Sequence, residues 1–312
     1  MEREVERIVR EIKSLKIQGA RNVARSAIEA LIIQIQKSKA KTKPELYSEL
    51  LEVGDALAGS RPTEPMMRNA ISDAVRFTLM QIKTHPALDV NVLKRAIVKE
   101  AVSYFDEMEA NQKRICDYGS KLVPDGGVVL THCHSSTVTG IMKRAKDVGK
   151  EFSVIALETR TRFQGRTTDK ELADYGIKTS LAVDGAVNIM MKKADMCMVG
   201  ADAITSMGDL INKVGTSTVA HIARSQDVSF YSAAELYKYD PLTLFGNREQ
   251  IEEREASEVW EGAPRSVKVR NPAFDATAAR YINGYLTEIG MIPPQSLWSI
   301  ATQRLGLQIA GI

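Results

Sequence analysis

Residues 124–157 read PDGGVVLTHCHSSTVTGIMKRAKDVGKEFSVIAL, and this stretch holds the pattern that decides the fold. A short apolar run, Val128–His132, is followed by a helical stretch, Ser136–Val148, and by a second apolar run, Phe152–Leu157. Short apolar runs between turn residues are typical of buried strands. The order strand, helix, strand predicts parallel pairing through a right-handed crossover. We therefore expect a doubly wound, Rossmann-like α/β domain.

The same alternation continues toward the C-terminus. We expect strands at Thr179–Val183, Met196–Val199 and Val228–Ser232, helices at Thr168–Tyr175, Gly185–Lys193 and Asn212–Ser225, and a last helix at about Ala276–Gly290. No GxGxxG follows the first strand and no GxxxxGK[ST] occurs, which argues against a dehydrogenase-type nucleotide site and against a P-loop.

Toward the N-terminus the pattern is helix after helix. Apolar residues recur at positions 5, 8, 9, 12 and 15, the spacing of one helical face. Further helices are expected near Lys43–Ala58, Glu64–Thr84 and Val90–Leu122. We therefore predict two domains, a helical N-terminal domain at residues 1–122 and the α/β catalytic domain at residues 123–312.

Composition excludes several classes of protein. The 312 residues carry a net charge of only +3, which argues against a dedicated nucleic-acid binder. No apolar run approaches the ~20 residues that span a bilayer, so no membrane association is expected. The N-terminal stretch is too charged for a signal peptide. Three scattered cysteines without a CxxC fit a reducing compartment, and we predict a cytoplasmic protein.

Ligands of open parallel sheets bind beyond the carboxyl ends of the strands. Four polar stretches follow predicted strands: Thr131–Thr137, Glu158–Gly165, Gly200–Ala203 and Glu235–Lys238. They bring a thiol, arginines, a carboxylate and a lysine to one edge of the sheet. The sequence therefore predicts an active site there, with Cys133 and Asp202 as its first candidates.

Each of these residues also has a purely structural interpretation. The predicted helix begins with Ser135, Ser136 and Thr137. Their hydroxyl and backbone N–H groups could bind a phosphate, or they could serve only as an ordinary N-cap. Cys133 with its neighbouring histidines suggests a metal site or a protease nucleophile, but no second Cys/His cluster occurs and the helical half does not suit a protease. An alternative role for Cys133 is proton acceptor, with a pKa lowered by the helix N-terminus and nearby arginine. Asp202 reads equally as a turn residue.

A set of motifs in a fixed order resembles one known family. They are Gly19-Ala20-Arg21, Ser60–Thr63, Thr131–Cys133, Glu158–Arg160 with Gln164-Gly165, Val199–Asp202, Gly208-Asp209, Asn212–Thr216, Asn271–Asp275 and Thr287–Gly290. The chain is thereby identified as a member of the family shared by archaeal ribose-1,5-bisphosphate isomerase, methylthioribose-1-phosphate isomerase and the α, β and δ regulatory subunits of initiation factor 2B. The regulatory subunits generally lack the Cys/Asp pair. His134, Ser135 and Ser136 after the cysteine look like the bisphosphate enzyme, whereas Gln18 replaces an arginine usual in the family.

The resemblance implies an aldose–ketose isomerase that converts α-D-ribose 1,5-bisphosphate to D-ribulose 1,5-bisphosphate in nucleoside monophosphate (AMP) degradation. Cys133 thiolate would be the base and protonated Asp202 the acid. The implied substrate-binding residues are Gly19, Ala20, Arg21, Asn22, Arg61, Ser135, Ser136, Thr137, Arg160, Gln164, Asn212, Lys213 and Lys238. No metal or other cofactor is implied, AMP is an expected activator, and a homo-oligomer (a dimer or hexamer) is expected. A regulatory subunit of the initiation factor 2B type and methylthioribose-1-phosphate isomerase stay as alternatives.

Overall fold

The structure, a computed structural model, describes residues 1–247 and 251–306. The chain forms two compact units, Met1–Ala110 and Asn111–Ile312. Helix α5 (Val90–Leu122) runs through this division. The boundary predicted between residues 122 and 123 is the point at which α5 ends.

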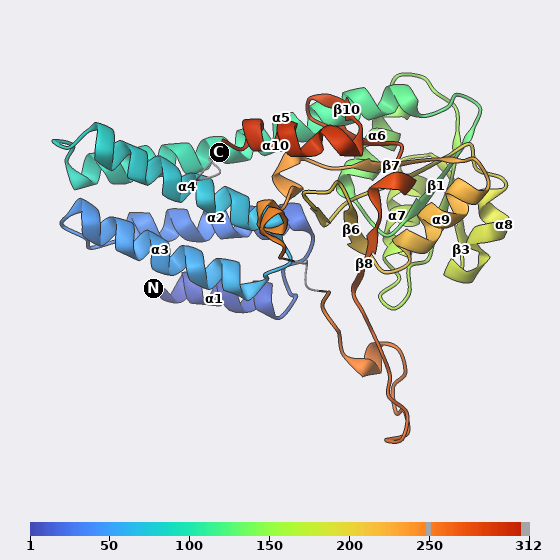
Figure 1. The fold of residues 1–312 in the computed structure, drawn as a ribbon, viewed down its shortest axis with the longest axis horizontal. Helices are drawn as coiled ribbons and strands as arrows, with labels where there is room; N and C mark the ends of the chain where they lie inside the picture. Colours follow the sequence, from blue (N-terminus) through green and yellow to red (C-terminus); the bar gives the residue numbers. More distant parts are fainter. Residues whose placement is uncertain (248–250, 307–312) are drawn as a thin grey trace. The chain divides into compact units, whose positions relative to one another are not determined.

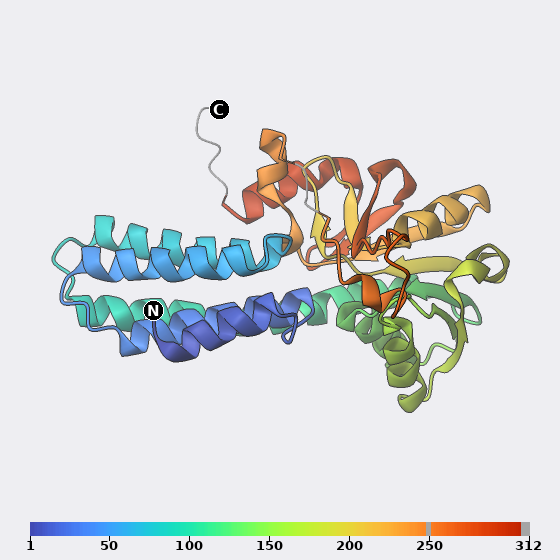
Figure 2. The same ribbon diagram turned by 90° about the horizontal axis from the view of Figure 1, so that it is seen from below.

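The N-terminal unit is helical throughout. It contains α1 (Arg3–Lys13), α2 (Ala20–Lys37), α3 (Lys43–Ser60), α4 (Pro65–Thr84) and the first part of α5. Thr42 and Glu45 form a capping box that begins α3, and α2 packs against α1, α3 and α4 (Figures 1 and 2). The helical interpretation of this half of the sequence is confirmed.

A seven-stranded sheet forms the centre of the second unit, in the order β10-β9-β7-β4-β1-β2-β3. Its strands are β1 (Val128–His132), β2 (Ser153–Leu157), β3 (Lys178–Ala182), β4 (Met196–Val199), β7 (Ser229–Ala233), β9 (Gly284–Thr287) and β10 (Gly290–Ile292). Every pair is parallel except β9 with β10. The predicted α/β fold with its mainly parallel sheet is therefore confirmed.

Helices cover both faces of this sheet (Figure 1). One core joins alternate strand residues such as Val129 and Met198 to α6 (Ser136–Asp147), α7 (Gln164–Asp174) and the end of α5. The other joins Leu130, Cys197 and their neighbours to α8 (Val187–Met191), α9 (Thr216–Ser225) and α10 (Leu297–Arg304). Burial on both faces explains why these strands are continuous apolar runs in the sequence.

A small antiparallel sheet stands beside the large one, in the order β5-β6-β8. Its strands are β5 (Ala203–Ile204), β6 (Leu210–Lys213) and β8 (Phe274–Thr277). The prediction of one helix over Asn212–Ser225 is wrong at its start, because Asn212 and Lys213 belong to β6 and α9 begins only at Thr216. The partner strand β8 lies roughly 60 residues later in the chain, so a local pattern does not reveal the pairing.

The predicted helix at Ala276–Gly290 is also wrong. This stretch contains the end of β8, a 3-10 turn at Ala279–Tyr281 and strand β9. All four residues of β9 are buried, so the alternation that marks a half-exposed strand is missing. The alanines at 276, 278 and 279 favour a helix by intrinsic propensity. Ala276 nevertheless lies in β8, where pairing with Ile211 of β6 overrides that preference.

The close packing of α7 against the end of β2 can be tested at Gly165. A Cβ at this position would lie 1.8 Å from the backbone oxygen of Leu157, the last residue of β2. Because a strand carbonyl cannot move aside as a flexible side chain can, Gly165→Ala is expected to lower the free energy of unfolding by about 3 kcal/mol. Urea unfolding measures this loss. Gly185→Ala, where a Cβ meets no atom within 4 Å, is the matched control. Equal stability of the two variants would contradict the packing described here.

Candidate active site

The site lies where the order of the strands reverses. From β1 the chain proceeds outward through β2 and β3, and then returns to the other side of β1 with β4. Strands β1 and β4 pair in parallel, with Val129 opposite Met196 and Leu130 opposite Cys197. Continuing this register brings Cys133 level with Gly200. A reversal of this kind separates the crossovers and leaves a crevice at the carboxyl ends of the strands.

Asp202 and Ser135 approach the same crevice from its two sides. A Cβ at Gly200 would lie 2.7 Å from the Ser135 Cβ, so the loop after β4 touches the start of α6. The Asp202 backbone N–H donates to the Ile211 carbonyl at 2.9 Å, which ties the backbone of residue 202 to strand β6. Cys133 and Asp202, predicted from separate loops, therefore belong to one local cluster.

The backbone holds Cys133 in an unusual conformation. Its φ of 70° lies in the left-handed region, which costs energy in a residue with a side chain. Two threonines fix it: the Cys133 N–H donates to Thr159 Oγ1 at 2.8 Å, and Thr168 Oγ1 donates to the Cys133 carbonyl at 3.0 Å. The Asp184 carboxylate in turn accepts the N–H groups of Thr159 and Arg160 at 2.8 and 2.7 Å. The thiol is thus positioned by a preformed network.

The expectation of a lowered thiol pKa is wrong in this structure. Cys133 is half-buried as a residue, but its thiol lies within the protein, and burial raises the thiol pKa to about 12. Lys213 opposes this rise, the negative charge of Asp202 adds to it, and Arg254 opposes it more weakly. Desolvation therefore outweighs the cations, and the thiol keeps its proton at neutral pH.

A buried threonine links the cationic strand β6 to β1. The Thr216 hydroxyl donates to the Lys213 carbonyl at 2.6 Å and accepts from Asn212 Nδ2 at 3.1 Å. Its remaining contact, 3.1 Å to His132 Nδ1, requires that this nitrogen carry the proton. Burial lowers the pKa of His132 to about 4, so the ring is neutral at physiological pH. His132 is therefore a fixed hydrogen-bond donor, and a metal-ligand role is not needed to explain it.

Lys238 reaches the site from the loop after β7. Its side chain is buried, and Nζ donates to the Ala201 carbonyl at 2.6 Å, next to Asp202. It ends the 3-10 turn Leu236–Lys238, whose first N–H donates to the buried Glu288 carboxylate at 3.1 Å. Burial raises the pKa of Glu288 to about 7, the charge of Glu235 adds to this, and the hydrogen bonds and Arg304 oppose it.

The raised pKa of Glu288 predicts a stability change with pH. A carboxyl whose pKa is about 7 in the folded chain and 4.5 unfolded stabilises the fold fully below pH 4.5 and loses this contribution as pH rises through 7. Glu288→Gln does not titrate. The free energy of unfolding of Glu288→Gln minus that of wild type should therefore be about 2 kcal/mol larger at pH 8.5 than at pH 5.5, because only wild type loses stability over this range. Urea unfolding at both pH values measures this. A pH-independent difference between the two proteins would rule out a raised Glu288 pKa.

The other predicted residues of this unit have distinct local partners. Ser135 is the N-cap of α6, where its Oγ accepts from the Val138 N–H at 3.4 Å; Ser136 is exposed and Thr137 is buried. Arg160 is exposed and donates to the Val259 carbonyl at 3.3 Å. Gln164 begins α7, and its Oε1 is shielded from solvent without a hydrogen-bond partner among the described residues. The N-cap interpretation of Ser135 therefore holds, and it is compatible with a ligand at the same helix start.

Five predicted binding residues belong to the helical unit, and whether they join the site stays a prediction. Gly19, with φ of 84°, precedes α2, and Ala20 begins it. Arg21 Nη1 donates to the Met108 carbonyl at 3.1 Å, and Asn22 Nδ2 donates to the Gln18 carbonyl at 3.0 Å. The buried Arg61 guanidinium pairs with Glu64 at 3.2 Å.

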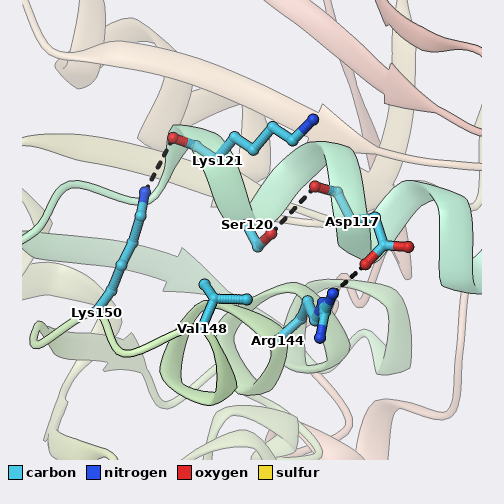
Figure 3. Close-up of a pocket in the computed structure, with 6 residues that line it drawn as sticks. All are labelled: Asp117, Ser120, Lys121, Arg144, Val148 and Lys150. Atoms are coloured by element: carbon cyan, nitrogen blue, oxygen red, sulfur yellow. Dashed lines mark hydrogen bonds and ion pairs between the residues drawn. The ribbon is translucent and has the colours of Figure 1, made fainter.

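A groove of about 420 Å³ lies elsewhere, between the ends of α5 and α6 (Figure 3). Two of its three cations are engaged in hydrogen bonds within the groove: Arg144 Nε donates to Asp117 at 2.7 Å, and Lys150 Nζ donates to the Lys121 carbonyl at 3.0 Å. Val148 caps the C-terminus of α6, and the 12 residues of α6 place it about 18 Å from the Ser135 end. This groove is therefore separate from the site at the strand ends.

Comparison with known proteins decides the family. The sequence profile of the initiation factor 2 subunit family matches residues 16–294. The chain belongs to this family. The resemblance stated from the motifs is confirmed.

Two relatives and one solved structure show the breadth of the initiation factor 2 subunit family. The ribose 1,5-bisphosphate isomerase of Pyrococcus furiosus is 40% identical over 97% of this chain and 95% of its own length. A methylthioribose-1-phosphate isomerase of Pelotomaculum thermopropionicum is 34% identical over 91% of this chain and 81% of its own. The crystal structure of translation initiation factor eIF-2B from Pyrococcus horikoshii OT3 has a TM-score of 0.79 at 29% identity, covering 94% of this chain and 98% of that one. Membership in the initiation factor 2 subunit family alone therefore does not decide whether a chain is an enzyme or a translation factor.

Several residues that shape the site were not singled out as site residues from the sequence. Thr159, Thr168 and Thr216 hold the backbone of the site. Thr159 and Thr216 lie in the motifs Glu158–Arg160 and Asn212–Thr216, but their residue type alone does not indicate this task, and Thr168 lies in no motif. Glu288 lies in the family motif Thr287–Gly290, which was noted without a role. Arg254 follows two glutamates and reads as part of a solvated charged face.

Two results concern metal-binding sites and membrane-spanning helices. Within residues 1–247 and 251–306, no cluster of three or more His, Cys, Asp or Glu side chains is arranged to hold a metal ion. No helix in the same residues is long and apolar enough to cross a membrane.

Proposed function

We propose that this chain is an isomerase that converts α-D-ribose 1,5-bisphosphate to D-ribulose 1,5-bisphosphate, with Cys133 and Asp202 as its proton-transfer pair. The observation that carries the proposal is the meeting of Cys133 and Asp202 at the reversal between β1 and β4, beside the buried cations Lys213 and Lys238. The identity of 40% to a ribose 1,5-bisphosphate isomerase supports the substrate.

The reaction begins with a proton transfer inside the pair. The thiol is protonated at rest, and the Asp202 carboxylate is close enough for its charge to act on that thiol. The thiol proton passes to Asp202, which leaves a thiolate beside Lys213 and a protonated carboxyl. This order of events reconciles the raised thiol pKa with the need for a base.

The thiolate then takes the proton from C2 of the sugar. The C2–H electrons form a C1=C2 double bond, the bond from C1 to the ring oxygen breaks, and Asp202 donates its proton to that oxygen. Protonation of the ring oxygen makes it the leaving group at C1 in preference to the phosphate. The product of this step is an open-chain enol that keeps both phosphates.

The second half returns both residues to their starting state. The 2-hydroxyl gives its proton to the Asp202 carboxylate, the C2=O bond forms, and the Cys133 thiol delivers its proton to C1. Asp202 then returns the proton that restores the thiol. The ammonium groups of Lys238 and of Lys213 on β6 stabilise the charge that develops on O2.

The paired assay of two sugars separates the rival functions. Purified protein is supplied with α-D-ribose 1,5-bisphosphate and, in parallel, with methylthioribose 1-phosphate. Because charge-assisted contacts to the second phosphate are absent with the latter, kcat/KM should favour the bisphosphate by about 100-fold or more. The reverse preference would identify a methylthioribose-1-phosphate isomerase. Turnover of neither sugar would favour a non-catalytic role of the translation-factor type.

The finer context of the enzyme rests on the family resemblance. We propose that the reaction serves nucleoside monophosphate degradation in the cytoplasm, with AMP as an activator. A homo-oligomer, either a dimer or a hexamer, is supported by the exposure of large apolar side chains, with Phe245 at 69%, Trp260 at 51% and Trp298 at 40%.

A further inference from the structure

We infer that Arg254 is a further substrate-binding residue, placed to hold a phosphate of the substrate together with Lys213. The inference rests on the proposed function and extends it, since no motif or relative described above assigns a role to Arg254. It depends on where the small sheet places this side chain.

The backbone of Arg254 is an additional edge of the small sheet. Glu253 forms an antiparallel bridge with Pro272, just before β8. The Arg254 N–H donates to the Asn271 carbonyl at 2.9 Å, and the Ala273 N–H donates to the Glu252 carbonyl at 2.8 Å. Arg254 is therefore anchored to the same sheet that carries Asn212 and Lys213 on β6.

The side chains of Arg254 and Lys213 meet around one aromatic ring. Phe274 is paired with Lys213 across β6 and β8. The Lys213 ammonium lies 5.2 Å and the Arg254 guanidinium carbon 6.0 Å from the centroid of the Phe274 ring. Contact with an aromatic ring helps to orient both cations.

Both cations act electrostatically on the thiol of Cys133. Lys213 and Arg254 are the two positive charges that oppose the rise of the Cys133 pKa, and Asp202 is the one negative charge that adds to it. The Arg254 Nε and Nη1 atoms are shielded from water. A guanidinium in such surroundings binds the two oxygens of a phosphate in parallel, which a lysine cannot do. Two phosphates on the substrate need two such cationic sites.

The test compares Arg254→Gln with Arg254→Lys and with the control Arg265→Gln, which changes an exposed arginine of the same loop. Arg254→Gln should raise KM for ribose 1,5-bisphosphate about 10- to 100-fold, with a smaller change in kcat. Arg254→Lys keeps the charge and should recover part of the loss. Arg265→Gln should match wild type. A KM for Arg254→Gln equal to that of Arg265→Gln would overturn the inference.

A second readout does not require turnover. The rate at which iodoacetamide alkylates Cys133 at pH 9, followed by mass spectrometry, reports the fraction of the thiol that is ionised. Repeating the reaction with inorganic phosphate tests whether a bound anion protects the thiol. Arg254→Gln should slow alkylation several-fold and weaken protection by phosphate, while Arg254→Lys and Arg265→Gln should not slow it. If wild type turns over neither sugar but shows these differences, the proposed function fails and the anion site stands. Unchanged alkylation and unchanged protection in Arg254→Gln would refute the anion site itself.

Discussion

Cys133→Ser is expected to lower kcat by about 10²- to 10⁴-fold while the fold remains intact. The serine hydroxyl nearly matches the thiol in size, and the contacts that hold residue 133 use its backbone N–H and carbonyl, which the substitution keeps. What is lost is the proton acceptor, because a hydroxyl is far less acidic than a thiol even when that thiol has a pKa of about 12. Steady-state turnover of ribose 1,5-bisphosphate measures the loss.

The matched control is Cys116→Ser, which changes the other half-buried cysteine, on α5. It should retain turnover close to wild type. Near wild-type kcat in Cys133→Ser would remove Cys133 from the mechanism. A comparable loss in both variants would instead indicate damage to packing.

Asp202→Asn is expected to lower kcat by a similar factor, since an amide neither accepts the thiol proton nor protonates the ring oxygen. The same change has a second, opposite effect. The negative charge of Asp202 raises the Cys133 pKa, so its removal should lower that pKa and speed alkylation of Cys133. Slower catalysis together with faster alkylation is a signature that loss of structure does not produce.

Asp209→Asn offers the comparison for Asp202→Asn. Asp209 follows in the same β5–β6 hairpin, and its carboxylate accepts from the Ala279 N–H at 2.8 Å, away from the thiol. It should leave the rate of Cys133 alkylation unchanged. If Asp202→Asn leaves both kcat and alkylation unchanged, Asp202 is a turn residue, the structural interpretation that the sequence also allows.

The sequence reveals five of the seven strands of the large sheet, because their signals are local; these are β1, β2, β3, β4 and β7. Val128–His132 and Met196–Val199 are bounded by turn residues, and the structure places β1 and β4 at those residues. The small sheet was not readable, because β6 pairs with a strand far along the chain and its Asn212-Lys213 end lies next to a true helix. Strand β9 was missed for a related reason, since full burial removes the alternation of polar and apolar residues.

For the site too, the sequence predicts which residues lie at the strand ends but not the properties that depend on tertiary packing. The rule that ligands bind at strand ends placed Cys133, Asp202 and Lys238 in one region without knowledge of contacts. The thiol pKa could not be anticipated in this way. The helix start and arginines argued for a lower pKa, whereas the desolvation that dominates depends on packing around the sulfur. Arg254 was overlooked because only the pairing of residue 253 with residue 272 brings it to Phe274.

If Cys133 and Asp202 isomerise ribose 1,5-bisphosphate, ³¹P NMR should detect the product directly. The protein is mixed with the α anomer, and the spectrum is followed over time for wild type and for Cys133→Ser. Wild type is expected to replace the anomeric phosphate resonance by that of the primary phosphate of ribulose 1,5-bisphosphate, with no release of inorganic phosphate, while Cys133→Ser should convert about 10²- to 10⁴-fold more slowly. Persistence of the anomeric resonance with wild type, or its conversion at an equal rate by Cys133→Ser, would contradict it.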